Sequence, residues 1–412
     1  MLESSLERIK KDIMELARFN ATPGKGCTRF SYSSEDKKAR AYLLQRFLEL
    51  GLKVSVDAVG NIRARREGSV LGAPIVMTGS HMDTVFNGGR FDGVAGVVCA
   101  LEAVRVICEN EIKTKNPVEI IIFAEEEGSN FGSTMAGSKA LTGRYGISEL
   151  KKLKSDNGRS MYDLAKDFGF EPDKLPDYII KPGEIKAMIE LHIEQSVVLD
   201  TENVPIGIVE AIFGSKCLRV VFKGVPNHAG ATPMHLRKDP MAAAAGVIAK
   251  LPEIVKQKAF PTTVATVGKI YCIPNIINCI PEKVAFTIDI RDVNPSGIEI
   301  IIKEVERLIN KMADLYCVEA AFEQLAESEV IKLSAKVIDA IEKAAKEQGI
   351  LYKKMNSGAV HDSAMLANFT EVGMIFVPSI GGRSHVPEEF TDIQDIKQGC
   401  DLLLKTIIAL SN

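Results

Sequence analysis

The chain has 412 residues, of which 46% are hydrophobic and 25% are charged. These are the proportions of a folded globular protein, and they exclude collagen-like, low-complexity and broadly disordered classes. The formal net charge of −3, from 51 basic and 54 acidic residues, lacks the basic excess expected of a nucleic-acid-binding protein. No apolar stretch reaches the roughly 18 residues that a membrane span needs. A chain of this length predicts two to three domains.

The N-terminal residues and the cysteines predict a cytoplasmic protein. Charged residues begin at Glu3, and no apolar block with a small-residue cleavage site follows, so we expect no secretory signal. The eight cysteines form neither a Cys-x-x-Cys pair nor a dense framework. In a chain of this size, such cysteines are expected to be the reduced thiols of an intracellular protein.

In chain order, the first half predicts helices that alternate with strands. The spacing of Leu2, Leu6 and Ile9 predicts an N-terminal helix that ends before Asn20, and a second helix is predicted to end at Gly51. The predicted strands are 53–57, 61–66, 75–80, 117–124 and 185–193, with a helix over 93–109. The continuous apolar runs among them predict strands buried on both faces of an α/β sheet. The polar stretch 148–184 predicts short surface helices.

After residue 210 the pattern changes. Strands are predicted at 217–224, 262–271 and 283–291, with helices at 239–257 and 296–313, which is the β-α-β-β-α-β order of an open-faced sandwich. A helix (331–348), a strand (372–377) and a helix (393–410) follow. We therefore predict an α/β fold in which a discontinuous domain, 1–210 plus 330–412, is interrupted by a smaller α+β domain at 211–329.

Histidines and carboxylates gather where the predicted strands end. The clusters are His81 and Asp83 in GSHMDTV, Asp92 in NGGRFDG, the triplet Glu125-Glu126-Glu127, His192 in ELHIEQ, and His385 in GGRSHVP. Loops at the carboxyl ends of strands build the sites of open α/β sheets. Adjacent desolvated carboxylates repel one another, and a cation relieves that repulsion. Imidazoles and carboxylates in this combination predict zinc or a similar divalent ion, and five clusters predict two ions that share one carboxylate.

The motifs GSHMDTVFNGGRFDG, AEEEGSNF, ELHIEQ, NHAGATPM and GGRSHVPEE, in this order, resemble the hydantoinase/carbamoylase branch of the dinuclear zinc amidohydrolases. That branch contains N-carbamoyl-L-amino-acid hydrolases, allantoate amidohydrolases and β-ureidopropionases. The resemblance extends over the whole chain. It implies a metallohydrolase catalytic domain, a homodimer joined through the inserted domain at 211–329, and a small-molecule substrate that bears a carboxylate, with no nucleic-acid or membrane partner.

The resemblance also implies the metal ligands. His81, Asp92 and His192 would hold one divalent ion, and Asp92 would bridge to a second ion held by Glu127 and His385. The two ions in each subunit would be zinc, or else manganese, cobalt or nickel.

Three further residues would be catalytic by the same resemblance. Asp83 would orient the His81 ring by accepting its distal N–H, as carboxylates commonly do behind zinc ligands. Glu126 would be the general base that takes a proton from water. His228, in the inserted domain, would polarise the substrate carbonyl from the partner subunit.

Four residues are expected to bind substrate. Asn278 and Arg291 match the positions that hold the substrate carboxylate in the family, and the planar fork of arginine suits both carboxylate oxygens. Gln195 is expected to face the site. His361 lies in SGAVHD, where the family has SGAGHD. It would either contact substrate or hold that loop, and the sequence leaves both open.

The chain departs from the family pattern at Asn130, where arginine is frequent, at Ser215, where glutamine is frequent, and at Glu282, where glycine is usual. None of these is a proposed metal ligand. Asn130 and Ser215 lie near substrate-facing segments, so the choice between N-carbamoyl-L-amino acids and allantoate stays open.

Three alternatives compete with this interpretation. An N-acyl-amino-acid deacylase or small-peptide metallopeptidase of the same superfamily is disfavoured by the histidine of ELHIEQ, because such relatives more often have a carboxylate there. A non-catalytic binding protein on the same fold would be expected to have lost the catalytic and metal-binding residues that are costly to keep, yet Glu126 and every proposed ligand are present. A dinucleotide-binding enzyme is disfavoured because no glycine fingerprint follows the first strands.

Overall fold

The computed structural model describes residues 2–412, which form two compact units. The first unit comprises the chain up to Glu210 together with Leu333–Asn412, and the second comprises Ala211–Lys332. The chain passes between them in β6 (Ile206–Ile212) and returns after β13 (Ile331–Lys332). The insert predicted over 211–329 thus extends to Lys332 in the structure.

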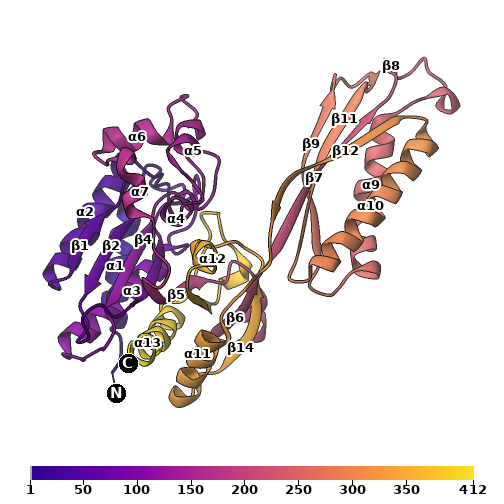
Figure 1. The fold of residues 1–412 in the computed structure, drawn as a ribbon. Helices are drawn as coiled ribbons and strands as arrows, with labels where there is room; N and C mark the ends of the chain where they lie inside the picture. Colours follow the sequence, from indigo (N-terminus) through magenta and orange to yellow (C-terminus); the bar gives the residue numbers. More distant parts are fainter. Residues whose placement is uncertain (1) are drawn as a thin grey trace. The chain divides into compact units, whose positions relative to one another are not determined.

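The first unit is built on a nine-stranded mixed sheet (Figure 1). The strand order is β1-β2-β4-β3-β5-β15-β6-β13, and β14 also pairs with β6. The remaining bounds are β1 (Lys53–Val56), β2 (Ile62–Arg66), β3 (Ile75–His81), β4 (Val118–Phe123), β5 (Ile185–Ile193), β14 (Tyr352–Ser357) and β15 (Glu371–Val377). Every residue of β3 and β4 is buried. Because successive side chains point to opposite faces, both faces of these strands are covered, as the apolar runs predict.

Four parallel strands bring the predicted ligands to one edge of this sheet. β3 pairs in parallel with both β4 and β5, and β5 pairs in parallel with β15. Their carboxyl ends therefore lie side by side. His81 is the last residue of β3, His192 is the penultimate residue of β5, and the loops after β4 and β15 contain the glutamate triplet and His385.

Helices pack on the sheet of the first unit and form most of the connections between its strands. Their bounds are α1 (Leu6–Arg18), α2 (Ser34–Glu49), α3 (Val94–Glu109), α4 (Ala136–Leu141), α5 (Ile147–Lys152), α6 (Met161–Phe168), α7 (Leu175–Tyr178), α8 (Val198–Glu202), α11 (Ala335–Gln348), α12 (Asp362–Leu366) and α13 (Ile393–Leu410). α3 is buried continuously from Val94 to Ile107. It packs against β3 and β5 and also against α1 and α13, which explains why its sequence is apolar on nearly all sides.

The second unit contains a four-stranded antiparallel sheet of order β12-β7-β11-β9, and its elements follow the predicted β-α-β-β-α-β order. The bounds are β7 (Gly214–Lys223), α9 (Pro240–Lys258), β9 (Val264–Ile273), β11 (Lys283–Asp292), α10 (Pro295–Tyr316) and β12 (Glu319–Ser328). Alternate residues Leu218, Val220 and Phe222 of β7 are buried in the apolar core shared with α9 and α10. Arg219, between the first two, and Lys223, after the last, are exposed, so the helices cover one face of the sheet.

Three strands of the nine-stranded sheet, β6, β13 and β14, are absent from the sequence prediction. β14 has the sequence YKKMNS, which shows no apolar alternation, and only its last residue is buried. Its extended conformation follows from pairing with β6, a partner about 140 positions earlier in the chain. β6, IGIVEAI, is apolar but lies directly at the boundary predicted at residue 210.

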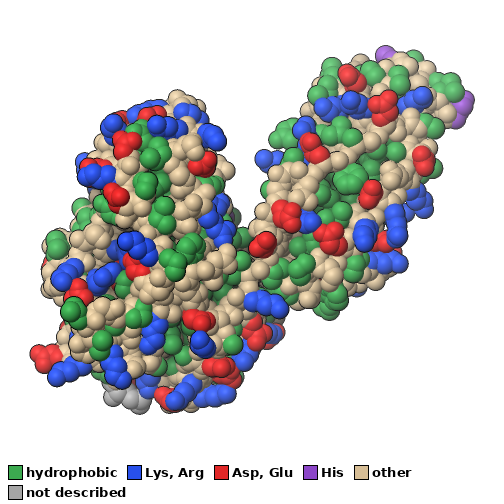
Figure 2. Space-filling model, viewed as in Figure 1, with side chains coloured by type: hydrophobic (Ala, Val, Ile, Leu, Met, Phe, Trp, Pro, Cys, Tyr) green, Lys and Arg blue, Asp and Glu red, His purple; other side chains and the backbone are tan. Residues whose placement is uncertain are grey.

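Basic and acidic side chains are interspersed over both units on the face drawn in Figure 2. Such mixing produces no broad field of one sign on that face, which a polyanion would require. Among the described residues, no helix is long and apolar enough to cross a membrane.

Candidate metal centre

Asp92 is placed beside two histidines by the loop between β3 and α3. Gly93 caps the N-terminus of α3 with a φ of 64°, in the left-handed region. A Cβ atom at this position would lie 2.5 Å from the His81 ring. The glycine therefore lets the loop turn directly over the imidazole and bring the Asp92 carboxylate next to it.

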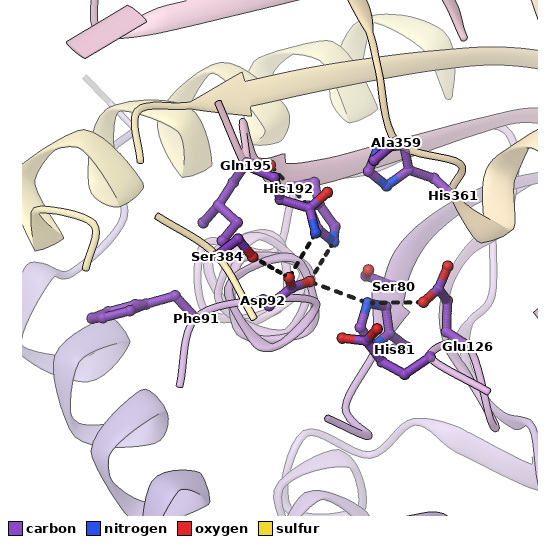
Figure 3. A network of polar contacts seen from close by, with 12 residues as sticks. Ser80, His81, Phe91, Asp92, Glu126, His192, Gln195, Ala359, His361 and Ser384 are labelled. Atoms are coloured by element: carbon purple, nitrogen blue, oxygen red, sulfur yellow. Dashed lines mark hydrogen bonds and ion pairs between the residues drawn. The ribbon is translucent and has the colours of Figure 1, made fainter. Parts of the chain in front are cut away.

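His81, Asp92 and His192 form a buried group of potential metal ligands. Asp92 Oδ1 lies 3.5 Å from His81 Nε2 and 3.2 Å from His192 Nε2 (Figure 3). Asp92 Oδ1 and His192 Nε2 nevertheless have no hydrogen-bond partner among the described residues. Buried polar atoms nearly always have one. A cation between these atoms would satisfy both, so this donor set fits a metal ion.

A second group consists of Asp92, Glu127 and His385. His385 Nε2 lies 3.3 Å from Asp92 Oδ2 and 3.5 Å from Glu127 Oε2. The two oxygens of Asp92 thus face different groups, Oδ1 the histidine pair and Oδ2 this second one. All five predicted metal ligands come together, and Asp92 belongs to both sets.

Main-chain carbonyls orient the two buried imidazoles. His81 Nδ1 lies 3.0 Å from the carbonyl oxygen of Asp83, and His192 Nδ1 lies 2.9 Å from that of Ile193. A ring that donates from Nδ1 presents the lone pair of Nε2, which is the atom facing Asp92.

The Asp83 carboxylate has other partners than the one predicted for it. It lies 3.9 Å from His81 Nδ1, whereas it accepts hydrogen bonds from the backbone N–H groups of Glu126 (3.2 Å) and Glu127 (3.1 Å). The side chain of Asp83 therefore holds the segment that presents these two glutamates.

The three adjacent glutamates have separate surroundings. Glu125 adopts a φ of 54°, and its Oε1 accepts the backbone N–H groups of Asn130 and Phe131, both at 3.0 Å. Glu126 points to the histidine pair, with Oε2 3.9 Å from His81 Nε2. Glu127 faces His385. The left-handed turn at Glu125 allows the next two carboxylates to reach different sides of the centre.

The proton affinities of the ligands reflect their burial and their neighbours. Burial, followed by the charge of Asp92, raises the pKa of Glu127 to about 7. Hydrogen bonding to Asp92 raises the pKa of His385 to about 9, against the effect of burial. Burial alone would raise the pKa of Asp92, but the surrounding histidines hold it well below its usual value.

The surroundings of Glu126 favour its protonated form in the absence of a cation. Burial raises its pKa well above the usual value; His81 opposes this shift, and the charges of Glu127 and Asp362 add to it. A bound cation would act in the same direction as His81 and favour the ionised carboxylate.

Gln195 and His361 lie on either side of His192 (Figure 3). Gln195, with a φ of 57°, donates from Nε2 to Asp92 Oδ2 at 2.7 Å. His361 is 2% exposed, its ring centroid lies 4.6 Å from that of His192, and its Nε2 lies 2.9 Å from Ser357 Oγ. The structure thus places His361 against a ligand ring and within its own loop.

The remaining predicted site residues belong to the second unit. His228 is in the short strand β8 (Asn227–His228), which pairs with β10 (Cys279–Ile280), and the carbonyl of Asn278 accepts the N–H of Ala229 at 2.9 Å. Arg291 forms an ion pair with Asp289 at 2.9 Å.

The ring of exposed His228 has a defined tautomer. Its Nδ1 lies 3.1 Å from the backbone nitrogen of Gly230 and 3.2 Å from that of Ala231, and both N–H groups donate to it. Because Nδ1 accepts, the proton of the neutral ring is on Nε2. His228 therefore presents an N–H donor.

Two of the residues at which this chain departs from the family pattern make local contacts. Asn130 donates from Nδ2 to the carbonyl of Ser31 at 2.8 Å. Ser215 Oγ lies 2.9 Å from Ser328 Oγ, on the neighbouring strand of the second unit.

Several buried acidic residues around the centre are absent from the predicted set. Glu190 accepts from Ser80 Oγ (2.7 Å), Asp362 accepts from Ser138 Oγ (2.5 Å), and Glu389 lies against the Asp92 loop. All three stand in the motifs quoted above: Glu190 begins ELHIEQ, Asp362 ends SGAVHD, and Glu389 ends GGRSHVPEE. Glu190 also lies within ligand distance of His192 and His361, but its oxygens already accept hydrogen bonds.

Comparisons with known proteins agree with this geometry. The model of Peptidase family M20/M25/M40 matches residues 77–409. The chain is 40% identical over 408 residues to an N-carbamoyl-L-amino-acid amidohydrolase of Paenarthrobacter aurescens, covering 99% of this chain and 98% of that protein. It is 32% identical over 412 residues to the allantoate amidohydrolase of Escherichia coli K12, covering 100% and 99%.

A crystal structure of an amidase of the hydantoinase/carbamoylase family from Burkholderia multivorans has a TM-score of 0.93 to this chain at 31% identity, covering 100% of this chain and 98% of that one. Together, the family and the two ligand groups support metal binding. The resemblance seen in the motifs is confirmed: the chain belongs to peptidase family M20/M25/M40, in its hydantoinase/carbamoylase branch.

Proposed function

We propose that this protein is a metal-dependent amidohydrolase that cleaves the C–N bond of a carbamoyl or ureido group in a small carboxylate-bearing substrate. The observation that carries the proposal is the sharing of Asp92 by two ligand groups, with Glu126 next to the first. The names of the relatives support N-carbamoyl-L-amino acids or allantoate as the substrate class.

The two ligand groups would hold two divalent ions in each subunit, zinc or else manganese, cobalt or nickel. When bound, such a pair supplies Lewis acidity toward the substrate carbonyl and lowers the pKa of a water molecule held there. His81 and His192 would serve one ion, Glu127 and His385 the other, and Asp92 both.

The protein's own groups would then move the protons. Glu126 would accept the proton of the attacking water and deliver it to the leaving nitrogen, so that it acts first as base and then as acid. His228 would donate its Nε2–H to the oxyanion that forms at the carbonyl carbon. The tautomer set by the Gly230 and Ala231 N–H groups supports this role, because no further protonation of the ring is needed.

Substrate binding is proposed for Asn278 and Arg291, which would hold the carboxylate, together with Gln195 near the centre. His361, packed on His192, would shape the site from behind that ring. We also propose that the protein is a cytoplasmic homodimer joined through the second unit, and that His228 acts in the partner's site.

The test combines metal analysis with a substrate panel. Purified protein is assayed with N-carbamoyl-L-amino acids, allantoate, N-acetyl amino acids and dipeptides, before and after chelation, with Glu126→Gln as the inactive control. We expect metal-dependent hydrolysis of a carbamoyl or ureido substrate and of no other compound in the panel. Metal-dependent turnover of N-acetyl amino acids or dipeptides alone would instead establish the deacylase or peptidase alternative. Absence of turnover in metal-loaded protein would favour a non-catalytic binding protein.

A further inference from the structure

Glu389 is a buried acidic residue that is not among the proposed ligands. It lies in the loop between β15 and α13, four residues after His385, and is 3% exposed. Its carboxylate touches two loops that are about 300 positions apart in the chain. Oε1 accepts the backbone N–H groups of Phe91 (2.9 Å) and Asp92 (3.1 Å). Oε2 lies 3.0 Å from Ser384 Oγ and accepts the N–H of His385 at 3.4 Å.

Neither ligand in these two loops lies within a helix or strand: Asp92 precedes α3, and His385 lies between β15 and α13. His385 has a φ of 62°, in the left-handed region that non-glycine residues adopt at a cost of about 1 kcal/mol or more. Such a conformation persists only where neighbouring groups hold it. Ser384 Oγ also lies 2.7 Å from Asp92 Oδ2, so the contacts of Glu389 continue to the carboxylate shared by both groups.

The Asp92 loop is shaped to receive this carboxylate. A Cβ atom at position 89 would lie 2.0 Å from the carboxyl carbon of Glu389. Glu389 therefore occupies the space that a side chain at this position would fill, and packs directly on the backbone of Gly89. This contact gives a physical reason for the second glycine of NGGRFDG.

We propose that Glu389 is a positioning residue for the metal centre: it ties the Asp92 loop to the His385 loop and so sets the spacing of two ligands of the Asp92–Glu127–His385 group. The inference rests on the proposed function, because it assumes that these residues bind metal. In the other group, His81 and His192 lie in β3 and β5, so only the shared ligand Asp92 depends on this link.

Substitution by glutamine separates this role from simple packing. Glu389→Gln keeps the size of the side chain but replaces one accepting oxygen with an NH₂ group, so one loop loses its acceptor. Removing the hydrogen-bonding partners of metal ligands typically lowers metal affinity 10- to 100-fold. We expect that loss in the binding step that involves His385, and a smaller loss in the other step, where Asp92 is the one ligand that the link holds.

The experiment titrates chelator-stripped, full-length protein with Mn²⁺. Calorimetry measures each binding step, and electron paramagnetic resonance detects a spin-coupled ion pair. The variants are Glu389→Gln, His385→Ala as the reference for loss of the second ion, and Glu388→Gln as the matched control. Glu388 precedes Glu389 in the chain and is exposed. We expect Glu389→Gln to lose the coupled signal at Mn²⁺ concentrations that saturate the wild type, and Glu388→Gln to retain it.

A folded Glu389→Gln protein with both binding steps unchanged would overturn the inference. If this variant does not fold, Gly89→Ala replaces it, because the added methyl group displaces the carboxylate from the loop without removing it. If Gly89→Ala leaves metal binding at the Asp92–Glu127–His385 group unchanged, the inference is likewise overturned. Wild-type protein that binds no divalent ion would overturn the proposed function as well, so the two failures are distinguishable.

Discussion

Metal binding at the Asp92–Glu127–His385 group should depend steeply on pH, because two of its ligands hold protons in the metal-free protein. The pKa of His385 is about 9, raised first by its hydrogen bond to Asp92, and that of Glu127 is about 7, raised first by burial. Both must lose their protons to bind a cation. The sign is therefore the same for both groups: affinity rises with pH.

The size of the effect follows from these two values. Between pH 6 and 8, deprotonation of His385 contributes about 90-fold and that of Glu127 about tenfold, a product on the order of 10³. The His385 side chain is 48% exposed, so solvent screening makes this an upper limit. With the ordinary imidazole pKa of about 6.5 for His385, the product falls to about 40-fold. We expect a value between these limits.

The assay is calorimetric titration of stripped protein at pH 6, 7 and 8, in buffers that differ in ionisation enthalpy. At pH 7 the step that fills this group should release about 1.5 protons, of which about one comes from His385. His385→Ala should lower the total release by about one proton. An affinity that does not change between pH 6 and 8, or equal proton release in the two proteins, would refute the reasoning.

Three further outcomes are expected. Chelation should lower the melting temperature, and by more at pH 8 than at pH 5.5. The reason is the raised pKa of Glu127: its contribution to the stability of the metal-free protein is fully present below about pH 4.5 and is lost as the pH rises through about 7. Glu126→Gln should retain metal but lose on the order of 10² or more in kcat, whereas Glu127→Gln should lose metal. Kinetics and metal analysis of both variants test this, and the opposite pattern would exchange the roles of the two glutamates. Mixing Glu126→Gln with His228→Ala under subunit exchange should restore up to one working site per mixed dimer, and no recovery despite exchange would place His228 in its own chain.

The position of the candidate metal centre could be predicted from the sequence, because local patterns determine the strands that surround it. The strands that contain His81 and His192 are mostly apolar, and such strands are buried on both faces in an α/β sheet. Parallel pairing then brings their carboxyl ends to one edge without further information. The proposed ligands therefore stand at the ends of predicted strands or in the loops that follow them.

The supporting contacts depended on the tertiary structure. The family resemblance implies that the carboxylate of Asp83 orients His81, but the main-chain carbonyl of Asp83 is the oxygen next to the ring, and only the tertiary structure distinguishes the two. Glu389 reaches the Asp92 loop from the other end of the chain, and β14 is a strand only because β6 pairs with it. A sequence pattern reports which side chains are apolar or charged within a few neighbours. Hydrogen bonds between loops about 300 positions apart arise only when packing has brought those loops together.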